Sequence, residues 1–417
     1  MHYRNEIHNT IWLAIFQALN YLIPLLLWPY LMKMLGAEQF GFFSFGFSMA
    51  QYLIILVDFG FNLSATKEIA LAHDDQQQIN RIFTSTLCAK LILLGLSLLI
   101  LLVVGFIPAY SAYREVMLVM YIMTIGCTFF FVWLFQGLGD IKVVSIINGV
   151  MKLAVLPLIF WLVRSPEDML LAALLQSMSY LLTAVLVVIV IRQRRYASLC
   201  RIRLKDIYES FRQSLPLFLS TAASSVYTML FVVIMAYYVS PEEVGRYSAS
   251  DKLVRCLTVM LWVPLCQAFF PKVSAIGKDD IDKGRDIVKK IMWMVCVGSL
   301  LLGAMIYFAA EPLCELLGKG YAGMGELTHL MALLPLLISS GGVLGQLGII
   351  GLGDETSKLS YRNIYLVAAV LSLCLVFPLT IRMSAVGTAI AMVVTEGFVA
   401  VAMVVLYRKT MKRLQMA

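Results

Sequence analysis

Three charged side chains stand close together at the start of an apolar segment, where they could bind an anion. The stretch ASDKLVRCLTVMLWVPL at 249–265 contains Asp251, Lys252 and Arg255. Spacings of three and four residues place all three on one helix surface, and about ten residues, or roughly 15 Å, separate Arg255 from the outer helix end. Arg255, with Lys252, would offer charge-assisted hydrogen bonds to a phosphate group. The alternative is an Asp251–Arg255 pair within the helix and a Lys252 side chain that reaches outward.

Four more ionisable side chains lie within or near other apolar segments, namely Asp58, Lys90, Lys152 and Glu396. A charge at the centre of a bilayer costs a few kcal/mol, so such groups usually face a helix-bundle interior or a wet cavity and often mark a transport pathway. Lys90 and Lys152 would each bind a ligand or pair with an acid, and Asp58 and Glu396 are the obvious acids. A buried carboxylate can also take up a proton, so Asp58 or Glu396 could couple transport to a proton or sodium gradient.

The composition is that of an integral membrane protein. Of 417 residues, 61% are hydrophobic and 14% are charged, against roughly a quarter charged in soluble domains. The first ten residues are polar, and the apolar stretch after them is about 20 residues long, which exceeds a cleavable signal. We therefore expect a cytoplasmic N-terminus.

Cysteine and histidine spacing predicts no metal site and no disulfide framework. The eight cysteines include no CxxC pair, and the four histidines show no ligand spacing. We expect no cofactor.

Windows of about 20 apolar residues predict an all-α polytopic membrane protein with twelve transmembrane helices. Their expected ranges are 11–31, 41–63, 82–107, 115–137, 143–163, 169–191, 215–239, 247–270, 291–310, 328–352, 363–381 and 385–407.

The distribution of lysine and arginine predicts the orientation. The connections 192–214 and 271–290 hold seven and six of these residues, the C-terminal tail holds four, and each expected outward connection holds one. The positive-inside rule then places both termini in the cytoplasm. The basic connection 192–214 lacks the interleaving of aromatic with basic residues and the recognisable module of a nucleic-acid-binding site, so no nucleic-acid partner is expected.

A repeated motif predicts two similar halves. LGAEQFGFFSF at 35–45 aligns with VSPEEVGRYSA at 239–249 at an offset of 204, which matches Glu38 with Glu242 and Gly41 with Gly245. The alternative is a convenient turn before a helix. Six spans between the copies give both halves one orientation, so we expect two parallel six-helix lobes around a central cavity. The predicted domains are a first lobe at 1–191, a basic cytoplasmic linker at 192–214 and a second lobe with a basic tail at 215–417.

Several longer motifs indicate a family. FQALNYLIPLLLWPYLMKMLG (16–36), DFGFNLSATKEIA (58–70), WLFQG (133–137), FPKVS (270–274) and VVTEG (393–397) resemble the bacterial O-antigen flippase family Wzx, within the multidrug/oligosaccharidyl-lipid/polysaccharide exporter superfamily. The resemblance covers almost the whole chain.

The resemblance implies an inner-membrane transporter that moves an undecaprenyl-diphosphate-linked O-unit from the cytoplasmic to the periplasmic leaflet by alternating access. Position by position, Asp58 and Asn62 occupy the acid and the asparagine of the second motif, Glu396 is the acid of the T-E pair, and Lys90 and Lys152 occupy basic positions. Candidate partners are an O-antigen polymerase and a chain-length regulator. Asp251 and Lys252 depart from the family pattern, which leaves open which cation contacts the diphosphate.

Three other functions were considered. An exporter of drugs or of another lipid-linked precursor would share the fold, and an acidic cavity would favour drug cations. A membrane polymerase or glycosyltransferase would need chemistry in a large extramembrane loop, and the longest outward connection here is short. A scaffold protein would have every buried charge paired locally.

Overall fold

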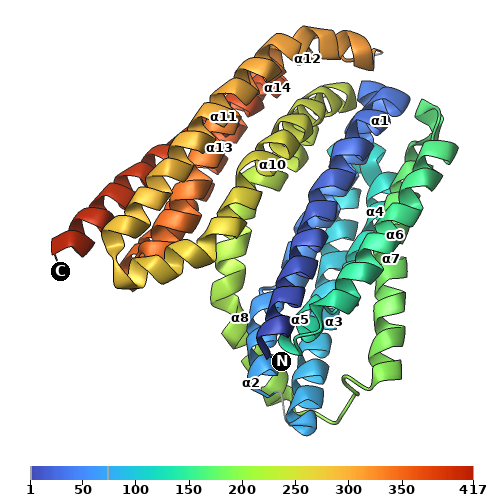
Figure 1. Ribbon diagram of the computed structural model, residues 1–417. Coiled ribbons are helices and arrows are strands. Elements are labelled where there is room, and N and C mark those ends of the chain that lie inside the picture. The colour runs from blue at the N-terminus through green and yellow to red at the C-terminus, as the bar shows by residue number, and fades with distance from the viewer. Residues whose placement is uncertain (1, 73–74, 319, 417) are drawn as a thin grey trace. The chain divides into compact units, whose positions relative to one another are not determined.

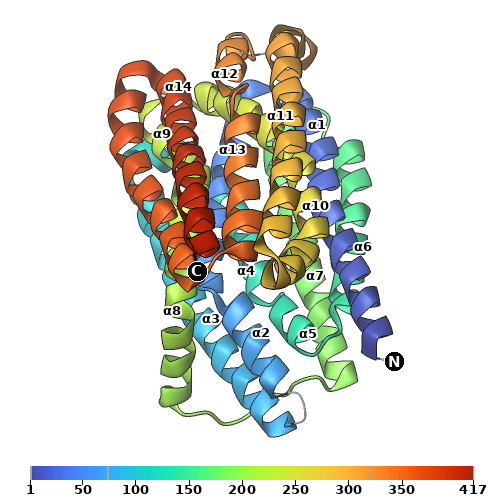
Figure 2. The ribbon, with the colours of Figure 1, turned by 60° about the vertical axis from the view of Figure 1, so that its left-hand side comes forward.

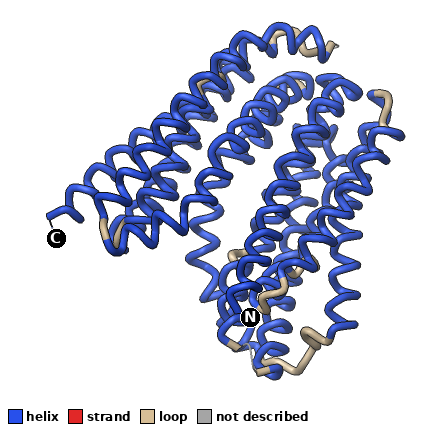
Figure 3. Tube along the Cα trace, in the orientation of Figure 1, coloured by secondary structure: helices blue, strands red, loops and turns tan. Residues whose placement is uncertain are grey.

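The computed structural model describes residues 2–72, 75–318 and 320–416. All regular structure within these ranges is helical and no strand occurs in them (Figure 3). The chain divides into two compact units, one formed by Met1–Leu35 with Phe42–Ser225 and one formed by Gly36–Gly41 with Val226–Ala417. The predicted all-α class is confirmed, and each unit is described by itself below.

The first unit contains most of α1 and the helices up to α8 (Figure 1). Their bounds are α1 (His2–Asp58), α2 (Phe61–Leu71), α3 (Gln76–Phe106), the 3-10 turn η1 (Pro108–Tyr113), α4 (Arg114–Thr128), α5 (Val132–Gly137), α6 (Ile141–Leu162), the 3-10 turn η2 (Pro166–Asp168), α7 (Met169–Arg194) and α8 (Leu204–Ser225).

The second unit contains the remaining helices and two π-helical segments, which often mark functional sites in membrane proteins and enzymes. The bounds are η3 (Val226–Leu230), α9 (Phe231–Tyr238), α10 (Pro241–Asp279), α11 (Ile281–Leu317), α12 (Met324–Met331), α13 (Leu334–Val343), η4 (Leu344–Ile350) and α14 (Glu355–Met416).

Within the described ranges, nine helical stretches are long and apolar enough to cross a membrane, and Thr228–Tyr238 is a shorter apolar helix. Two of the nine stretches each hold two of the predicted spans. Gly36 (φ 71°) interrupts α1 between its two spans, and Ser384 (φ 52°) interrupts α14. The chain is therefore a multi-pass membrane protein whose helices follow the predicted succession of spans.

Two connections contain more helix than the sequence predicted. In the connection 192–214, α8 begins at Leu204, and in 271–290 only Asp280 separates α10 from α11. Asp280 caps α11 by accepting a hydrogen bond from the Lys283 amide at 3.0 Å, and the bonds from Lys283 lower the pKa of its carboxyl. Because polar residues continue a helix as well as apolar ones do, hydropathy windows end before the helices end. The domain boundaries at 192 and 214 stay a prediction.

The core of the first unit depends on close helix contacts. α4 packs along α7, and a Cβ added at Gly126 would lie 2.6 Å from the carbonyl carbon of Tyr180. Small residues allow membrane helices to approach in this way. Phe131 and Trp133, both buried, anchor an apolar cluster where α4 gives way to α5.

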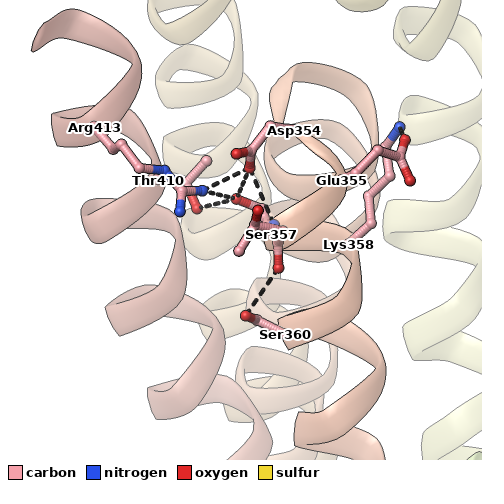
Figure 4. A network of polar contacts seen from close by, with 8 residues as sticks. Asp354, Glu355, Ser357, Lys358, Ser360, Thr410 and Arg413 are labelled. Carbon is pink, nitrogen blue, oxygen red and sulfur yellow. Dashed lines mark hydrogen bonds and ion pairs between the residues drawn. The ribbon is translucent and has the colours of Figure 1, made fainter. Parts of the chain in front are cut away.

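In the second unit, α13 lies between α11 and α14 (Figure 2). A polar network joins the beginning of α14 to its end, as Figure 4 shows. Arg413 Nη2 lies 2.6 Å from Asp354 Oδ1 and 2.9 Å from Ser357 Oγ, and the hydroxyls of Ser357 and Thr410 are 2.8 Å apart. In the segment GLGDE at 351–355, the preceding helix ends at Leu352 and α14 begins at Glu355.

The repeated motif makes a reciprocal contact inside the second unit, to which Gly36–Gly41 belongs. A Cβ added at Gly41 would overlap the Pro241 carbonyl oxygen, and one added at Gly245 would overlap the Ala37 carbonyl oxygen. The same Cβ atoms would lie 3.0 Å from the Gly245 nitrogen and 3.1 Å from the Gly41 nitrogen. Both residue pairs are related by the offset of 204, so each copy contacts the other as the two halves of a two-fold interface do.

Candidate functional site

The break after α1 places two of the predicted site residues. Phe59 (φ 41°) and Gly60 (φ 80°) both adopt left-handed backbone conformations. They separate the end of α1 at Asp58 from the start of α2 at Phe61, one residue before Asn62. A Cβ at Gly60 would lie 2.8 Å from Leu217 Cβ, so this position needs glycine for both conformation and space. A strained non-glycine residue such as Phe59 is typical of functional sites.

Asp58 receives two side-chain hydrogen bonds within the first unit. Lys90 Nζ donates to Asp58 Oδ1 at 2.8 Å, and Asn62 Nδ2 donates to Asp58 Oδ2 at 3.1 Å. The Lys90 side chain is fully buried, whereas Asp58 is 27% exposed. The structure thus brings together three predicted residues and uses the charge of Lys90 in an ion pair. This geometry favours the pairing alternative for Lys90 over direct contact with a ligand.

Lys152 lies in a different environment, a pocket of about 240 Å³ in the first unit. Its ammonium group is 5.4 Å from the centroid of the Tyr180 ring, a cation–π distance. Gln51, Gln176 and Trp28 also line this pocket. A cation among amide, hydroxyl and indole groups suits an anionic or polyhydroxylated ligand.

The second unit contains a cluster of three predicted residues. Arg255 Nε donates to Asp251 Oδ1 at 2.6 Å, and Arg255 Nη1 lies 3.6 Å from Glu396 Oε1. Exposed fractions are 21% for the Arg255 side chain, 9% for Asp251 and 7% for Glu396. A further contact runs from Arg255 Nη2 to the Met392 sulfur at 3.0 Å. Two carboxylates hold the guanidinium group, which favours the alternative of a structural Asp251–Arg255 pair.

Lys252 lies on the same helix as Arg255 but is directed elsewhere. Its ammonium group is 5.8 Å from the centroid of the Phe40 ring, and Phe40 belongs to the same unit. Because the side chain is only partly buried, it can still meet a ligand.

Sequence reasoning missed the side chains that surround Lys152. Gln176 and Tyr180 are four residues apart on α7, so they share one helix face. Polar groups at that spacing in an otherwise apolar span are the signal that could have identified them. Met392, which contacts Arg255, carries no such signal because methionine is common in membrane helices.

No group of three histidine, cysteine, aspartate or glutamate side chains among the described residues could hold a metal ion.

The succession of apolar helices, with charges buried inside them, defines a polytopic membrane protein. A multidrug resistance MATE family transporter of the MOP superfamily, in an inward-facing conformation, has a similar structure, with a TM-score of 0.71 at 14% identity, covering 95% of this chain and 99% of that one. The lipid II flippase MurJ in an inward closed conformation gives a TM-score of 0.75 at 9% identity, covering 96% and 87%. At these identities the similarity supports the fold.

The family follows from the sequence. The chain belongs to the polysaccharide biosynthesis protein family, whose model matches residues 7–277. A protein of Escherichia coli (strain K12) is 29% identical over 402 residues, 96% of each chain. A protein of Shigella dysenteriae is 33% identical over 393 residues, 93% of this chain and 96% of that one. Both are named "Putative O-antigen transporter". The family resemblance found in the sequence motifs is confirmed, and a transporter rather than an enzyme agrees with these relatives.

Proposed function

We propose that this protein is a flippase that moves undecaprenyl-diphosphate-linked O-antigen repeat units from the cytoplasmic to the periplasmic leaflet of a bacterial inner membrane. The observation that carries the proposal is the similarity to two proteins named as O-antigen transporters along more than nine-tenths of the chain. Both termini lie in the cytoplasm in this proposal, in agreement with the distribution of lysine and arginine.

The physical problem explains why such a transporter needs charges inside its spans. A diphosphate and an oligosaccharide cannot cross hydrocarbon unaided, because removing water from charges and hydroxyls costs several kcal/mol for each group. A wet, cationic path would shelter the head group while the polyprenyl chain stays in lipid. Alternating access of the two lobes would then expose that path to one leaflet at a time.

The pairing geometry refines which residues would contact the substrate. Lys152, which lines a pocket with amide and hydroxyl side chains in the first unit, is the cation that we assign to the diphosphate. Lys252, which is partly exposed in the second unit, is the second candidate, and Lys90 and Arg255 each pair with a carboxylate. Asn62, which is exposed beside Asp58, would contact the sugars. Arg255 and Lys90 would position the helices around the path.

Ion coupling is a separate part of the proposal. Asp58 and Glu396 are the carboxylates that would exchange a proton or a sodium ion, each in competition with its cation partner. Dissipating the proton gradient and the sodium gradient separately in transport-competent vesicles tests this, because only the coupling gradient should change the rate.

The test of function is leaflet accessibility of the lipid-linked O-unit in cells that lack the protein. Wild type should restore access from the periplasm. Lys152→Met should lower the rate about tenfold through the loss of one charge-assisted contact, and Lys152→Arg should keep part of it. Lys142→Met is the matched control, because Lys142 is exposed on the same helix.

Two results would count against the proposal in different ways. Unchanged accessibility after deletion of the gene would overturn the function. Full activity of Lys152→Met at equal membrane levels would remove only Lys152 from the path.

A further inference from the structure

A second pocket of the first unit lies beside the apolar cluster that contains Phe131. Its volume is about 740 Å³, inside the range of roughly 300–1,000 Å³ common for small-molecule sites. The beginning of α3, the end of α7, the segment between α4 and α5 and residues 197–199 form its walls. None of the residues assigned to the transport path lines it.

The lining of this pocket is largely apolar. Phe83, Leu87, Phe129, Val188 and Ile191 line it, together with the polar side chains of Gln76, Asn80 and Ser198. Part of the pocket wall comes from the break between two helices. α4 ends at Thr128 and α5 begins at Val132, and Phe129 and Phe131 from the non-helical chain between them line the pocket. The apolar part of the lining suits a hydrocarbon chain better than an oligosaccharide, whose hydroxyl groups would lose their water against it without replacement.

The rim of the pocket is basic. Arg192 and Arg195 both line it and both are exposed. Among the residues that the structure describes, no carboxylate lies within the ion-pair distance of 4.0 Å from either side chain. The arginine between them differs, because Arg194 Nη1 lies 2.9 Å from Asp140 Oδ2. Of these three arginines, Arg192 and Arg195 therefore contribute positive charge to the lining of the pocket without a carboxylate beside them among the described residues.

The backbone at the rim is strained. Arg195 ends α7 in a left-handed conformation (φ 54°, ψ 34°), at a helix position where glycine is usual. A bulky residue there costs free energy. A functional role for the side chain would explain its presence at this position.

We propose that this pocket binds an anionic glycerophospholipid, with one acyl chain inside it and the phosphate on Arg192 and Arg195. Guanidinium groups form paired, charge-assisted bonds with phosphate oxygens. Basic pockets between membrane helices bind the head groups of anionic lipids in this way. The inference does not depend on the transported substrate.

The test is native mass spectrometry of the purified full-length protein with phosphatidylglycerol, with phosphatidylcholine of the same acyl chains, and with inorganic phosphate alone. Wild type should bind phosphatidylglycerol most tightly. Arg192→Gln and Arg195→Gln should each weaken that binding about tenfold, and Leu87→Trp should weaken binding of both lipids by filling the interior. Arg201→Gln, which removes an arginine that does not line this pocket, should have no effect.

A second variant keeps the test decisive if Arg195→Gln folds poorly. Arg195→Gly removes the same charge at a position whose backbone favours glycine, so it should fold and still lose the lipid.

Three results would overturn the assignment. Equal affinity for the two lipids in wild type would exclude charge recognition, and inorganic phosphate bound as tightly as phosphatidylglycerol would exclude the acyl chain. Displacement of bound phosphatidylglycerol by a polyprenyl diphosphate at much lower concentration would reassign the pocket to that lipid.

Discussion

The Lys90 ammonium group lies 2.8 Å from Asp58 Oδ1, although 32 residues separate the two in the chain. The pair joins α3 to the end of α1 at the strained turn of Phe59 and Gly60. Lys90 is fully buried, whereas Asp58 keeps some exposure to solvent. Loss of the ion pair should therefore cost more free energy at the lysine, which has no water to replace its partner, than at the carboxylate.

This asymmetry predicts the effect of breaking the pair. Asp58→Asn leaves a buried ammonium group without its counter-charge and should lower the free energy of unfolding by about 3–5 kcal/mol, as for other buried pairs. The double variant Asp58→Asn/Lys90→Met should recover a large part of that loss. Thermal unfolding of the purified single and double variants measures both changes in stability. If the stability losses of the two single substitutions simply added up in the double variant, the ion pair would be contradicted.

The Arg255 cluster predicts a difference between arginine and lysine. One guanidinium group reaches both Asp251 and Glu396, and a lysine ammonium group has no planar fork with which to do so. Arg255→Lys should therefore lower both thermal stability and transport, and Arg255→Met should lower stability further. A variant with wild-type stability and abolished transport would instead assign Arg255 to the substrate.

The reciprocal glycine contact predicts matched effects at two distant positions. Gly41→Ala and Gly245→Ala should each destabilise the protein by about 1–3 kcal/mol, as other overpacked sites do, because each new Cβ meets a backbone carbonyl. Gly95→Ala is the control, since a Cβ there meets nothing within 4 Å. Alanine should stabilise that helix position by up to about 1 kcal/mol. The melting temperatures of the three variants measure these effects. Clearly unequal decreases in melting temperature for Gly41→Ala and Gly245→Ala would disprove the reciprocal contact.

The network at Asp354 predicts acid sensitivity at the two ends of α14. Hydrogen bonds from Ser357, together with Arg413, lower the pKa of the Asp354 carboxyl below its ordinary 3.8. A lowered pKa means that the network stabilises the fold above that ordinary value, and that this contribution is lost as the pH falls through the pKa of the folded state.

Amide hydrogen exchange at the end of α14 measures this effect. Protection from exchange there, relative to the intrinsic amide rate at the same pH, should fall below about pH 4. In Asp354→Asn this protection should already be low at neutral pH and should depend less on acid. Glu355→Gln is the control, because Glu355 pairs only with the neighbouring Lys358 in the described network and is 86% exposed. An acid response that persists unchanged in Asp354→Asn would contradict the role of this carboxyl.

Hydropathy and local spacing predicted much of the fold. The helices follow the expected spans, and the i, i+4 spacing of Asp251 and Arg255 predicted their contact as one of two alternatives. These features depend on residues near one another in the chain, so the sequence contains them directly.

The long-range contacts could not be predicted in the same way. Glu396 on α14 contacts Arg255, and Lys90 pairs with Asp58 rather than with another acid. Which residues form these pairs depends on how the helices pack. Tyr180 and Gln176 beside Lys152 depend on the close approach of helices that Gly126 permits. The helical start of the 192–214 connection at Leu204 was missed because its polar residues resemble a loop.

Gly41 and Gly245 each lie against the backbone of the other copy of the repeated motif, and there is no room for a Cβ at either position. Since each contact includes the backbone that carries the other glycine, a displacement at one contact also changes the other. The two glycines therefore impose one shared constraint on both copies of the motif.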